Sequence, residues 1–187
     1  MKKLVIIING AGGVGKDTLC DLSGKYFKVK NVSSIDPVKK IAKEAGWKGE
    51  KTTEARRFLA ELKRILIEYN DTPVRYLIEK YKEFIDSDEE ILYCHIREPE
   101  EIEKFKGYVV TDCMTLLIKR DTGVETWGNT ADDEVENFDY DYIYNNNFIL
   151  KDTEKYFYEL LRDKLESLKE VDFESVKIPT YNKEEDD

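Results

Sequence analysis

Cysteines and long apolar runs are scarce in this sequence, and each shortage excludes a class of protein. The 3 cysteines are widely spaced and form no C-x-x-C pair, so the sequence predicts neither a disulfide framework nor a zinc site. The apolar run at residues 4–8 is much shorter than the ~20 residues of a membrane-spanning helix and than the apolar region of a signal peptide. We therefore expect a soluble, cytoplasmic protein with reduced thiols.

Positive charge is also in the minority. The chain carries 40 acidic and 30 basic residues, which gives a formal net charge of -10. A chain with this negative field is not expected to bind nucleic acid or an anionic membrane through its overall charge. A site for a phosphate compound must gather lysines and arginines locally, so the position of each arginine is informative.

The order of the predicted elements indicates the fold class. At 187 residues the chain is long enough for one domain with a substantial core. We predict strands at residues 3–9, 27–34, 89–96, 114–120 and 139–145, and helices at residues 16–27, 36–46, 53–70, 71–85, 98–105 and 152–168. Strands that alternate with helices predict an α/β domain with a mainly parallel sheet.

The helix predicted at residues 53–70 has the clearest periodicity. Its apolar residues recur at steps of three and four and predict one stripe that faces a core. These residues are Ala55, Phe58, Leu59, Leu62, Ile65, Leu66 and Tyr69. The helix at residues 36–46 is predicted to have Asp36 as its N-cap and Pro37 at its first helical position. Because residues 47–86 contain no predicted strand, we expect them to form an insertion that can move as a unit.

The most specific pattern joins the first strand to the first helix. Residues 10–16, GAGGVGK, fit the G-x-x-x-x-G-K phosphate-binding loop in the context that this motif requires. Glycines allow positive φ and a close approach of the backbone to a ligand, and the loop N–H groups with the following helix N-terminus form an anion cradle. We predict a bound nucleotide triphosphate, with Lys16 reaching its β- and γ-phosphates. The expected contacts are Gly10, Gly12, Gly13, Val14, Gly15, Lys16, Asp17 and Thr18.

The residue after the lysine departs from the motif. Asp17 replaces the usual serine or threonine, and Thr18 follows it. A carboxylate cannot act as the hydroxyl ligand of Mg²⁺, so Asp17 would hold the metal through water or orient the incoming group. The alternative is an acidic residue that the helix dipole favours at this position. Thr18 is the candidate for contact with the α-phosphate.

The segment GVGKDT resembles the phosphate loop of P-loop nucleoside and deoxynucleoside monophosphate kinases, particularly the phage-type deoxynucleotide monophosphate kinases. In that group a D-P-[IV]-K segment follows, matched by residues 36–39, and then a strand ending in arginine that leads to an acidic helix, matched by HIREPEEIEKF at residues 95–105. A later strand ending in arginine, LLIKR at residues 116–120, and an acidic stretch before the last strand also agree. The resemblance covers most of residues 1–168.

This resemblance implies a three-layer α/β/α P-loop fold with a five-stranded parallel sheet. A single kinase domain would span residues 1–175, with a helical acceptor-binding region at residues 47–86, a lid loop at residues 121–138 and an acidic tail at residues 176–187. The implied activity is transfer of the γ-phosphoryl group of ATP to a nucleoside or deoxynucleoside 5′-monophosphate, with ATP and Mg²⁺ as cofactors. The base, the sugar and the existence of a homodimer are left open.

Phosphoryl transfer depends mainly on positioning and positive charge, and two arginines at strand ends are the best candidates for the latter. Arg97 and Arg120 each follow a predicted strand, and open α/β sheets bind ligands at the carboxyl ends of their strands. We expect both to be catalytic, together with Lys16 and Asp17.

The longest predicted helix near the middle of the chain carries two further basic pairs. Arg56 with Lys63, and Arg57 with Arg64, are each seven residues apart. Either pair could meet an acceptor phosphate, and the alternative is a solvated basic face in which Arg57 pairs with Glu61. We prefer Arg56 and Arg57 as substrate-binding residues.

Four further polar positions have both a functional and a structural explanation. Asp36 and Lys39 of the D-P-V-K segment are candidates for acceptor binding, with helix capping as the alternative for Asp36. His95 stands where related kinases often have an aspartate near the metal, but a lone histidine in a strand is more often structural. Residues 145–147, three asparagines, follow the last strand, where such folds hold adenine, and a polar turn explains them equally well.

Two other functions compete with the monophosphate kinase. P-loop kinases of the phosphomevalonate or dephospho-coenzyme A type share the architecture, but they account less well for the D-P-V-K segment together with the helical insertion. The other alternative is a nucleotide-binding regulator without catalysis. No N-K-x-D guanine signature occurs within the predicted domain, and the long loop at residues 121–138 is what a lid needs to exclude water from the reaction.

Overall fold

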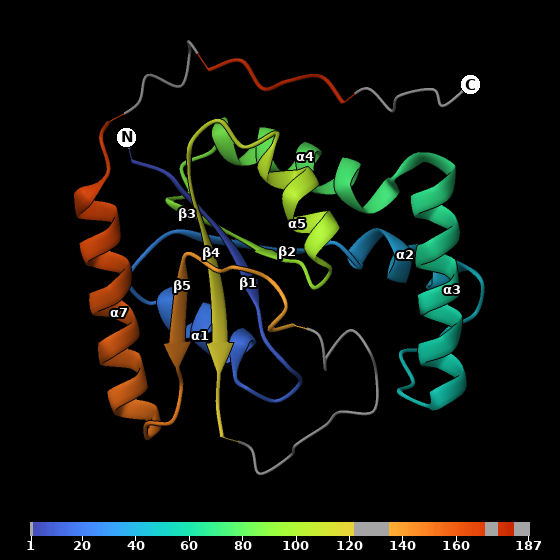
Figure 1. Ribbon diagram of the computed structural model, residues 1–187, viewed down its shortest axis with the longest axis horizontal. Coiled ribbons are helices and arrows are strands. Elements are labelled where there is room, and N and C mark those ends of the chain that lie inside the picture. Colours follow the sequence, from blue (N-terminus) through green and yellow to red (C-terminus); the bar gives the residue numbers. More distant parts are fainter. Residues whose placement is uncertain (1, 122–134, 171–175, 182–187) are drawn as a thin grey trace.

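Strands and helices alternate along the chain as predicted (Figure 1). The computed structural model describes residues 2–121, 135–170 and 176–181. The elements are β1 (Leu4–Asn9), α1 (Lys16–Ser23), β2 (Val29–Ser33), α2 (Asp36–Glu44), α3 (Thr53–Asn70), α4 (Thr72–Ile85), β3 (Ile91–His95), α5 (Pro99–Lys106), β4 (Asp112–Lys119), β5 (Tyr142–Asn145) and α7 (Leu150–Ser167). Most of the lid loop expected at residues 121–138 lies outside the described residues.

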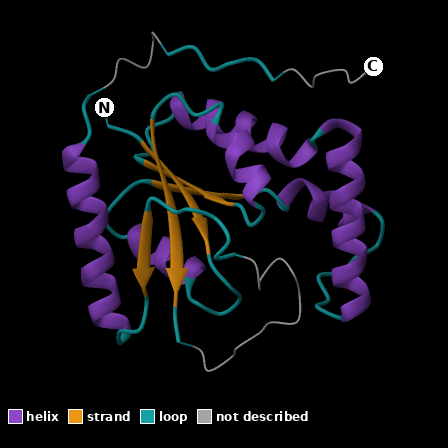
Figure 2. Cartoon of the chain, in the orientation of Figure 1, coloured by secondary structure: helices purple, strands orange, loops and turns teal. Residues whose placement is uncertain are grey.

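The five strands form one parallel sheet in the order β2-β3-β1-β4-β5 (Figure 2). β1 occupies the centre, where Ile8 pairs with His95 of β3 and Asn9 pairs with Leu117 of β4. Because all strands run in the same direction, the loops that follow β1, β3 and β4 leave the sheet at the same edge. The predicted α/β class and the five-stranded parallel sheet are confirmed.

β1 is buried on both faces and alternates its side chains between two hydrophobic cores. Leu4, Ile6 and Ile8 belong to one core, and Val5 and Ile7 belong to the other. The first core is closed by α1 and α7, and the second by α4 and α5. Helices therefore cover both faces of the sheet, which gives the three-layer α/β/α arrangement.

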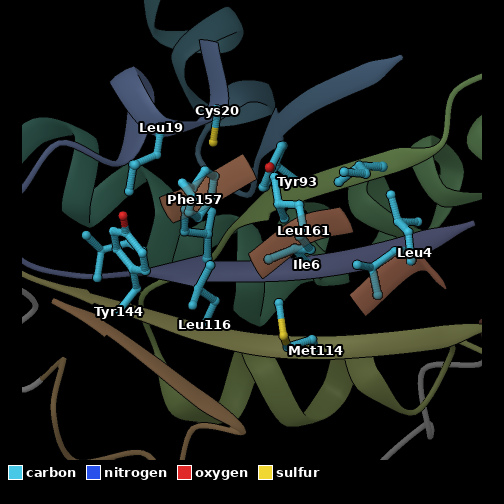
Figure 3. Packing of buried hydrophobic residues seen from close by; sticks show 14 of the residues in the cluster. Leu4, Ile6, Leu19, Cys20, Tyr93, Met114, Leu116, Tyr144, Phe157 and Leu161 are labelled. Atoms are coloured by element: carbon cyan, nitrogen blue, oxygen red, sulfur yellow. The ribbon is translucent and has the colours of Figure 1, made fainter. Parts of the chain in front are cut away.

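The first core is rich in large side chains (Figure 3). Tyr144 of β5 packs against Phe157 of α7 with the ring centroids 5.3 Å apart. Leu161 of α7 and Leu19 of α1 are also fully buried in this cluster. The burial of a large apolar side chain contributes about 1.5–3 kcal/mol, so this core fixes the first helix behind the sheet.

The neighbouring helices α3 and α4 differ in their burial. α4 packs against β2 and β3 and buries seven residues, Pro73, Val74, Leu77, Ile78, Tyr81, Phe84 and Ile85. In α3 only Ala55 is buried, while Phe58 is 42 %, Ile65 52 % and Tyr69 77 % exposed. The prediction that the α3 stripe faces a core is therefore wrong for most of its length. α3 lies at the edge of the molecule against α2 and α4 (Figure 1), because the sheet face is already covered by α4 and α5.

This difference divides the stretch at residues 47–86, which we expected to move as one unit. α4 belongs to the second core, so a displacement of the whole stretch would uncover that core. α3, which has a single buried residue, lacks that constraint.

The start of α2 also differs from the prediction. The residue in the N-cap position is Ile35, and Asp36 is the first residue of the helix, so the N-cap assignment of Asp36 is wrong. The Asp36 carboxylate instead accepts a hydrogen bond from the backbone N–H of Ser33 at 2.8 Å. Pro37 is therefore the second residue of the helix and not the first, but it still lies in the first turn, where its missing N–H costs nothing.

The chain beyond α7 returns to the domain. Ile178 and Tyr181 pack against the second core, and the Tyr181 hydroxyl donates a hydrogen bond to Asp71, the residue between α3 and α4, at 3.1 Å. The described part of the predicted acidic tail is therefore in contact with the fold. In the described ranges, no helix has both the length and the apolar character that crossing a membrane requires.

Candidate active site

The glycine-rich loop that joins β1 to α1 has the backbone that a phosphate-binding loop requires. Gly10, Gly13 and Gly15 have φ angles of 144°, 80° and 95°, which glycine adopts without the steric cost that a Cβ imposes. Gly15 is the N-cap residue of α1, so the loop leads directly into the positive end of a helix dipole.

Two of these glycines are also required by close contacts. A Cβ on Gly10 would lie 2.5 Å from the carbonyl oxygen of Ile118 in β4, and a Cβ on Gly15 would lie 2.6 Å from the amide nitrogen of Asn146. The loop is therefore pressed against the end of β4 and the residue that follows β5. This packing fixes the loop in place independently of any ligand.

The side chain of Asn146 holds the glycine loop in place through hydrogen bonds. Its buried side-chain amide donates to the carbonyl of Val14 at 2.8 Å and accepts a hydrogen bond from the Thr153 hydroxyl of α7 at 3.1 Å. Its backbone N–H donates to the carbonyl of Lys119 at 2.7 Å. This role of Asn146 differs from both explanations proposed for the asparagines after the last strand, which were a contact with adenine and a simple polar turn.

Asn9 makes a second such connection. The buried Asn9 side chain accepts a hydrogen bond from the Gly10 N–H at 2.8 Å and donates to the carbonyl of Arg97 at 3.0 Å. It also donates to the hydroxyl of Tyr140 at 2.7 Å. The start of the loop is thereby tied to the segment after β3. A single polar residue that ends an aliphatic strand was the only sequence signal for this role.

Lys16, Asp17 and Thr18 form the first turn of α1. The Lys16 ammonium donates hydrogen bonds to the carbonyls of Gly10 and Ala11, which places the positive charge at the loop. The side chains of Asp17 and Thr18 are exposed. Two oxygen-bearing side chains therefore stand beside the charged lysine at the surface.

This donor set fits Mg²⁺ better than a metal held by protein alone. Within the described ranges, no cluster of three or more His, Cys, Asp or Glu residues could hold a metal ion. Mg²⁺ ordinarily keeps several waters and takes only one or two carboxylates together with substrate phosphates. Asp17 and Thr18, exposed beside the loop, can supply such oxygen contacts.

His95, the last residue of β3, lies beside the first turn of α1. Its Nδ1 is 4.0 Å from the Asp17 carboxylate. Burial lowers the pKa of His95, and Asp17 opposes this shift, with Lys16, Asp36 and Lys39 making smaller electrostatic contributions. The imidazole is therefore neutral at neutral pH. Ser33, at the end of β2, pairs with His95, and α2 with the expected acceptor residues Asp36 and Lys39 begins three residues later.

The structure separates the four basic residues of α3. Lys63 pairs with Glu98 at 2.6 Å and Glu101 at 3.0 Å, and Arg64 pairs with glutamates of its own helix. Glu61 accordingly pairs with Arg64 and not with Arg57. Arg56 and Arg57 are exposed, with no ion pair to another described residue, and they remain the substrate-binding candidates.

The Lys63 contact reveals a buried acidic network that the sequence analysis missed. Glu101 is buried, and its Oε2 accepts hydrogen bonds from Lys63 at 3.0 Å and from the Ser34 hydroxyl at 2.9 Å. Burial raises the pKa of Glu101 to about 7, although Lys63 opposes the shift. For Glu98 the effect of burial is outweighed, mainly by Lys63, so its pKa is lowered. The network holds α3 against the start of α5.

Arg97 and Arg120 follow the ends of β3 and β4, as predicted, and both are exposed. The pairing of β3 and β4 with β1 brings these ends to the same edge as the glycine loop. Lys119, which precedes Arg120, pairs with Glu136 at 2.6 Å. The parallel sheet therefore gathers Lys16, Arg97 and Arg120 at one edge of a chain whose net charge is -10.

Comparisons with known proteins identify the fold. The sequence matches no protein-family model and no curated protein. A putative kinase from Chloroflexus aurantiacus j-10-fl has a similar structure, with a TM-score of 0.53 and 12 % identity over 87 % of this chain and 98 % of that chain. A sugar kinase from Janibacter sp. HTCC2649 gives a TM-score of 0.50 and 13 % identity over 87 % and 95 %. At these identities the likeness concerns the fold alone, and this chain shares the α/β fold of these two proteins.

Proposed function

We propose that this chain transfers the γ-phosphoryl group of ATP to a nucleoside or deoxynucleoside 5′-monophosphate, giving the nucleoside diphosphate and ADP. One observation carries the proposal. A glycine loop with positive φ at Gly10, Gly13 and Gly15 ends in Lys16 and Asp17 at the sheet edge where Arg97 and Arg120 also emerge. The resemblance of the G-K-D-T loop and the D-P-V-K segment to deoxynucleotide monophosphate kinases adds the acceptor class.

The roles follow from the positions of the side chains. The N–H groups of the loop and of the first turn of α1 bind the triphosphate. Lys16 neutralises charge on the transferring group, and Arg97 and Arg120 stabilise the charge that develops in the transition state. Asp17 would hold Mg²⁺ through water, and the metal would supply positive charge that neutralises the phosphates.

The acceptor would lie between the loop and the helices α2 and α3. Asp36 and Lys39 of α2 follow the end of β2, where Ser33 pairs with His95 at the same edge of the sheet. Arg56 and Arg57 at the start of α3 are free of the ion pairs that occupy Lys63 and Arg64. Guanidinium groups bind phosphate in a bidentate manner, which favours a phosphate-bearing acceptor over a neutral one.

A second candidate is a kinase whose acceptor is an alcohol rather than a phosphate. The similarity in fold to a protein named as a sugar kinase favours it. The two candidates differ in the acceptor alone, because both need the same loop, lysine and metal.

The test is ADP release from ATP and Mg²⁺ in the presence of a panel of nucleoside monophosphates, deoxynucleoside monophosphates and hydroxyl acceptors. We expect release to be stimulated by one or a few monophosphates and to disappear in the Lys16→Ala variant. Stimulation by a hydroxyl acceptor alone would favour the second candidate. Tight ATP binding without stimulation by any acceptor would contradict both and favour a nucleotide-binding regulator.

A further inference from the structure

The chain has a single histidine, and it lies beside the residue at which the phosphate-binding loop departs from its usual form. His95 is 19 % exposed, whereas the Asp17 side chain is 95 % exposed. The distance of 4.0 Å between His95 Nδ1 and Asp17 Oδ1 is longer than a hydrogen bond. Rotation of the exposed Asp17 side chain can shorten it to a hydrogen bond.

The other ring nitrogen has different neighbours. Nε2 of His95 lies 3.8 Å from the Sγ of Cys20 in α1 and 3.4 Å from the Oδ1 of Asn31 in β2. Burial raises the pKa of the Cys20 thiol, so Cys20 remains protonated and can donate its S–H to Nε2. Asn31 is exposed, and its amide can turn to present either an acceptor or a donor.

These neighbours decide which nitrogen carries the proton. A neutral imidazole has one N–H donor and one acceptor. An ionised carboxylate only accepts hydrogen bonds, so Asp17 requires the proton on Nδ1. With the proton on Nε2, the lone pair of Nδ1 would face the Asp17 carboxylate and the Cys20 thiol would have no acceptor on the ring. The Nδ1–H form satisfies Asp17 and Cys20, and it requires the exposed Asn31 amide to turn its nitrogen, in place of Oδ1, toward Nε2.

We propose that His95 is a positioning residue for Asp17, which its Nδ1–H group holds in a fixed orientation beside Lys16. The proposal rests on the proposed function, because Asp17 needs a fixed orientation only if it acts on the metal shell or the acceptor. Among the described residues it places the imidazole between α1, which carries Asp17 and Cys20, and β2, which carries Asn31. His95 itself does not contact the reacting atoms.

An exposed carboxylate benefits from such a partner. A side chain that is 95 % exposed samples several rotamers, and only some of them direct its oxygens toward a ligand at the loop. Carboxylates that act at metal sites are commonly held by a second group, and loss of that group costs about 10- to 100-fold in activity or metal affinity. His95 is the residue in position to do this for Asp17.

The first test needs no enzymatic activity. Because His95 is the only histidine, the imidazole signals in a ¹⁵N–¹H NMR spectrum at pH 8 require no assignment, and the two neutral tautomers give distinct nitrogen shifts. We expect the Nδ1–H form in the wild-type protein and a shift toward the Nε2–H form in Asp17→Asn. Asp17 is exposed, so this substitution leaves the packing intact. A wild-type protein in the Nε2–H form would overturn the proposal.

The second test separates positioning from structure. In His95→Asn the amide nitrogen stands the same number of bonds from Cβ as Nδ1, whereas in His95→Gln it stands one bond farther. We expect His95→Asn to retain most of the turnover and His95→Gln to lose about 10- to 100-fold in kcat, with nearly unchanged KM for ATP. Equal losses in both variants, in step with lowered melting temperatures, would show a merely structural role and overturn the proposal.

A double-mutant cycle completes the design. If His95 acts through Asp17, His95→Gln should cause no further loss in an Asp17→Asn background. Equal losses in both backgrounds would show independent action and contradict the proposal. Should no acceptor stimulate turnover, the proposed function fails while the NMR test still decides the tautomer, so the two failures are distinguishable.

Discussion

Around the glycine loop at residues 10–16, backbone and buried amides meet at close range, whereas around α3 charged side chains such as Arg56 and Arg57 are exposed. Gly15 has no room for a Cβ beside Asn146, and Asn146 holds the carbonyl of Val14. On α3, Arg56 and Arg57 are exposed, and a single residue of the helix is buried. The glycine loop, which is the proposed phosphate side, is thus packed without a ligand. On α3, which is the proposed acceptor side, Arg56 and Arg57 are available to contact one.

The comparison predicts that the largest single loss of activity comes from the phosphate side. Lys16→Ala should lower turnover about 10²- to 10³-fold, because it removes a preorganised positive charge from the transferring phosphoryl group. The melting temperature should fall only slightly, because the half-buried Lys16 contributes hydrogen bonds to the carbonyls of Gly10 and Ala11. Lys48→Ala, an exposed lysine, serves as the control. Turnover like that of the wild type in Lys16→Ala would remove the loop from the mechanism.

The close packing of the loop can be tested with two glycines of nearly equal φ. Gly15 has a φ of 95° and Gly49 a φ of 94°, but a Cβ on Gly49 meets nothing within 4 Å. Both alanine substitutions carry the cost of a left-handed backbone, about 1–2 kcal/mol, and only Gly15→Ala also displaces Asn146. We expect urea unfolding to show a larger loss of stability for Gly15→Ala, with weakened ATP binding in that variant alone. Equal losses for the two variants would show that the contact with Asn146 is unimportant.

The proposed acceptor side can be tested by replacing arginines of α3 that differ in whether they form ion pairs. Arg56→Ala or Arg57→Ala should raise the KM for the acceptor about 10- to 100-fold, since a charge-assisted hydrogen bond contributes about 1.5–3 kcal/mol. Arg64→Ala should leave KM nearly unchanged, because Arg64 is already paired with Glu61 and Glu68. Steady-state kinetics with the best acceptor measure both. A KM effect confined to Arg64→Ala would reverse our assignment.

The smallest expected effect concerns the network that attaches α3 to α5. The pKa of Glu101 is raised from 4.5 to about 7 by burial, so the folded protein binds this proton more tightly than the unfolded chain. Stability should therefore fall as the pH rises from about 4.5 to 7 and then level off, although the lowered pKa of Glu98 contributes a smaller change of the opposite sign. Glu101→Gln should flatten this dependence in urea titrations at pH 5, 6, 7 and 8. Glu100→Gln, exposed on the same helix, should follow the wild type, and parallel curves for all three proteins would contradict the account.

The local parts of this molecule were predictable and the distant contacts were not. The strand, the glycine spacing and the lysine of the loop lie within 13 consecutive residues, from Leu4 to Lys16, so the motif carried its own context. The hydrogen bond between Asn146 and Val14 joins residues 132 positions apart, and it depends on the strand order of the sheet. Nothing in the sequence around either residue indicates it.

The helices α3 and α4 also show that contacts between distant segments could not be predicted from the sequence. Both helices, α3 and α4, were correctly predicted, and periodicity indicated an apolar stripe on α3, but periodicity gives the direction of a stripe without the partner of that stripe. α4 packs against the sheet and buries seven residues. α3 lies at the edge of the molecule, and its Ile65 and Tyr69 are exposed. The choice depends on which helix occupies the limited area of the sheet face, a property of the whole fold.

The proposed activity is tested most directly by ³¹P NMR of the protein with ATP, Mg²⁺ and the monophosphate that best stimulates ADP release. We expect the monoester resonance of the acceptor to be converted into phosphoanhydride resonances in step with the loss of the γ-phosphate of ATP. Lys16→Ala should leave both signals unchanged. Formation of inorganic phosphate with an unaltered acceptor resonance would show hydrolysis in place of transfer and would contradict the assignment as a monophosphate kinase.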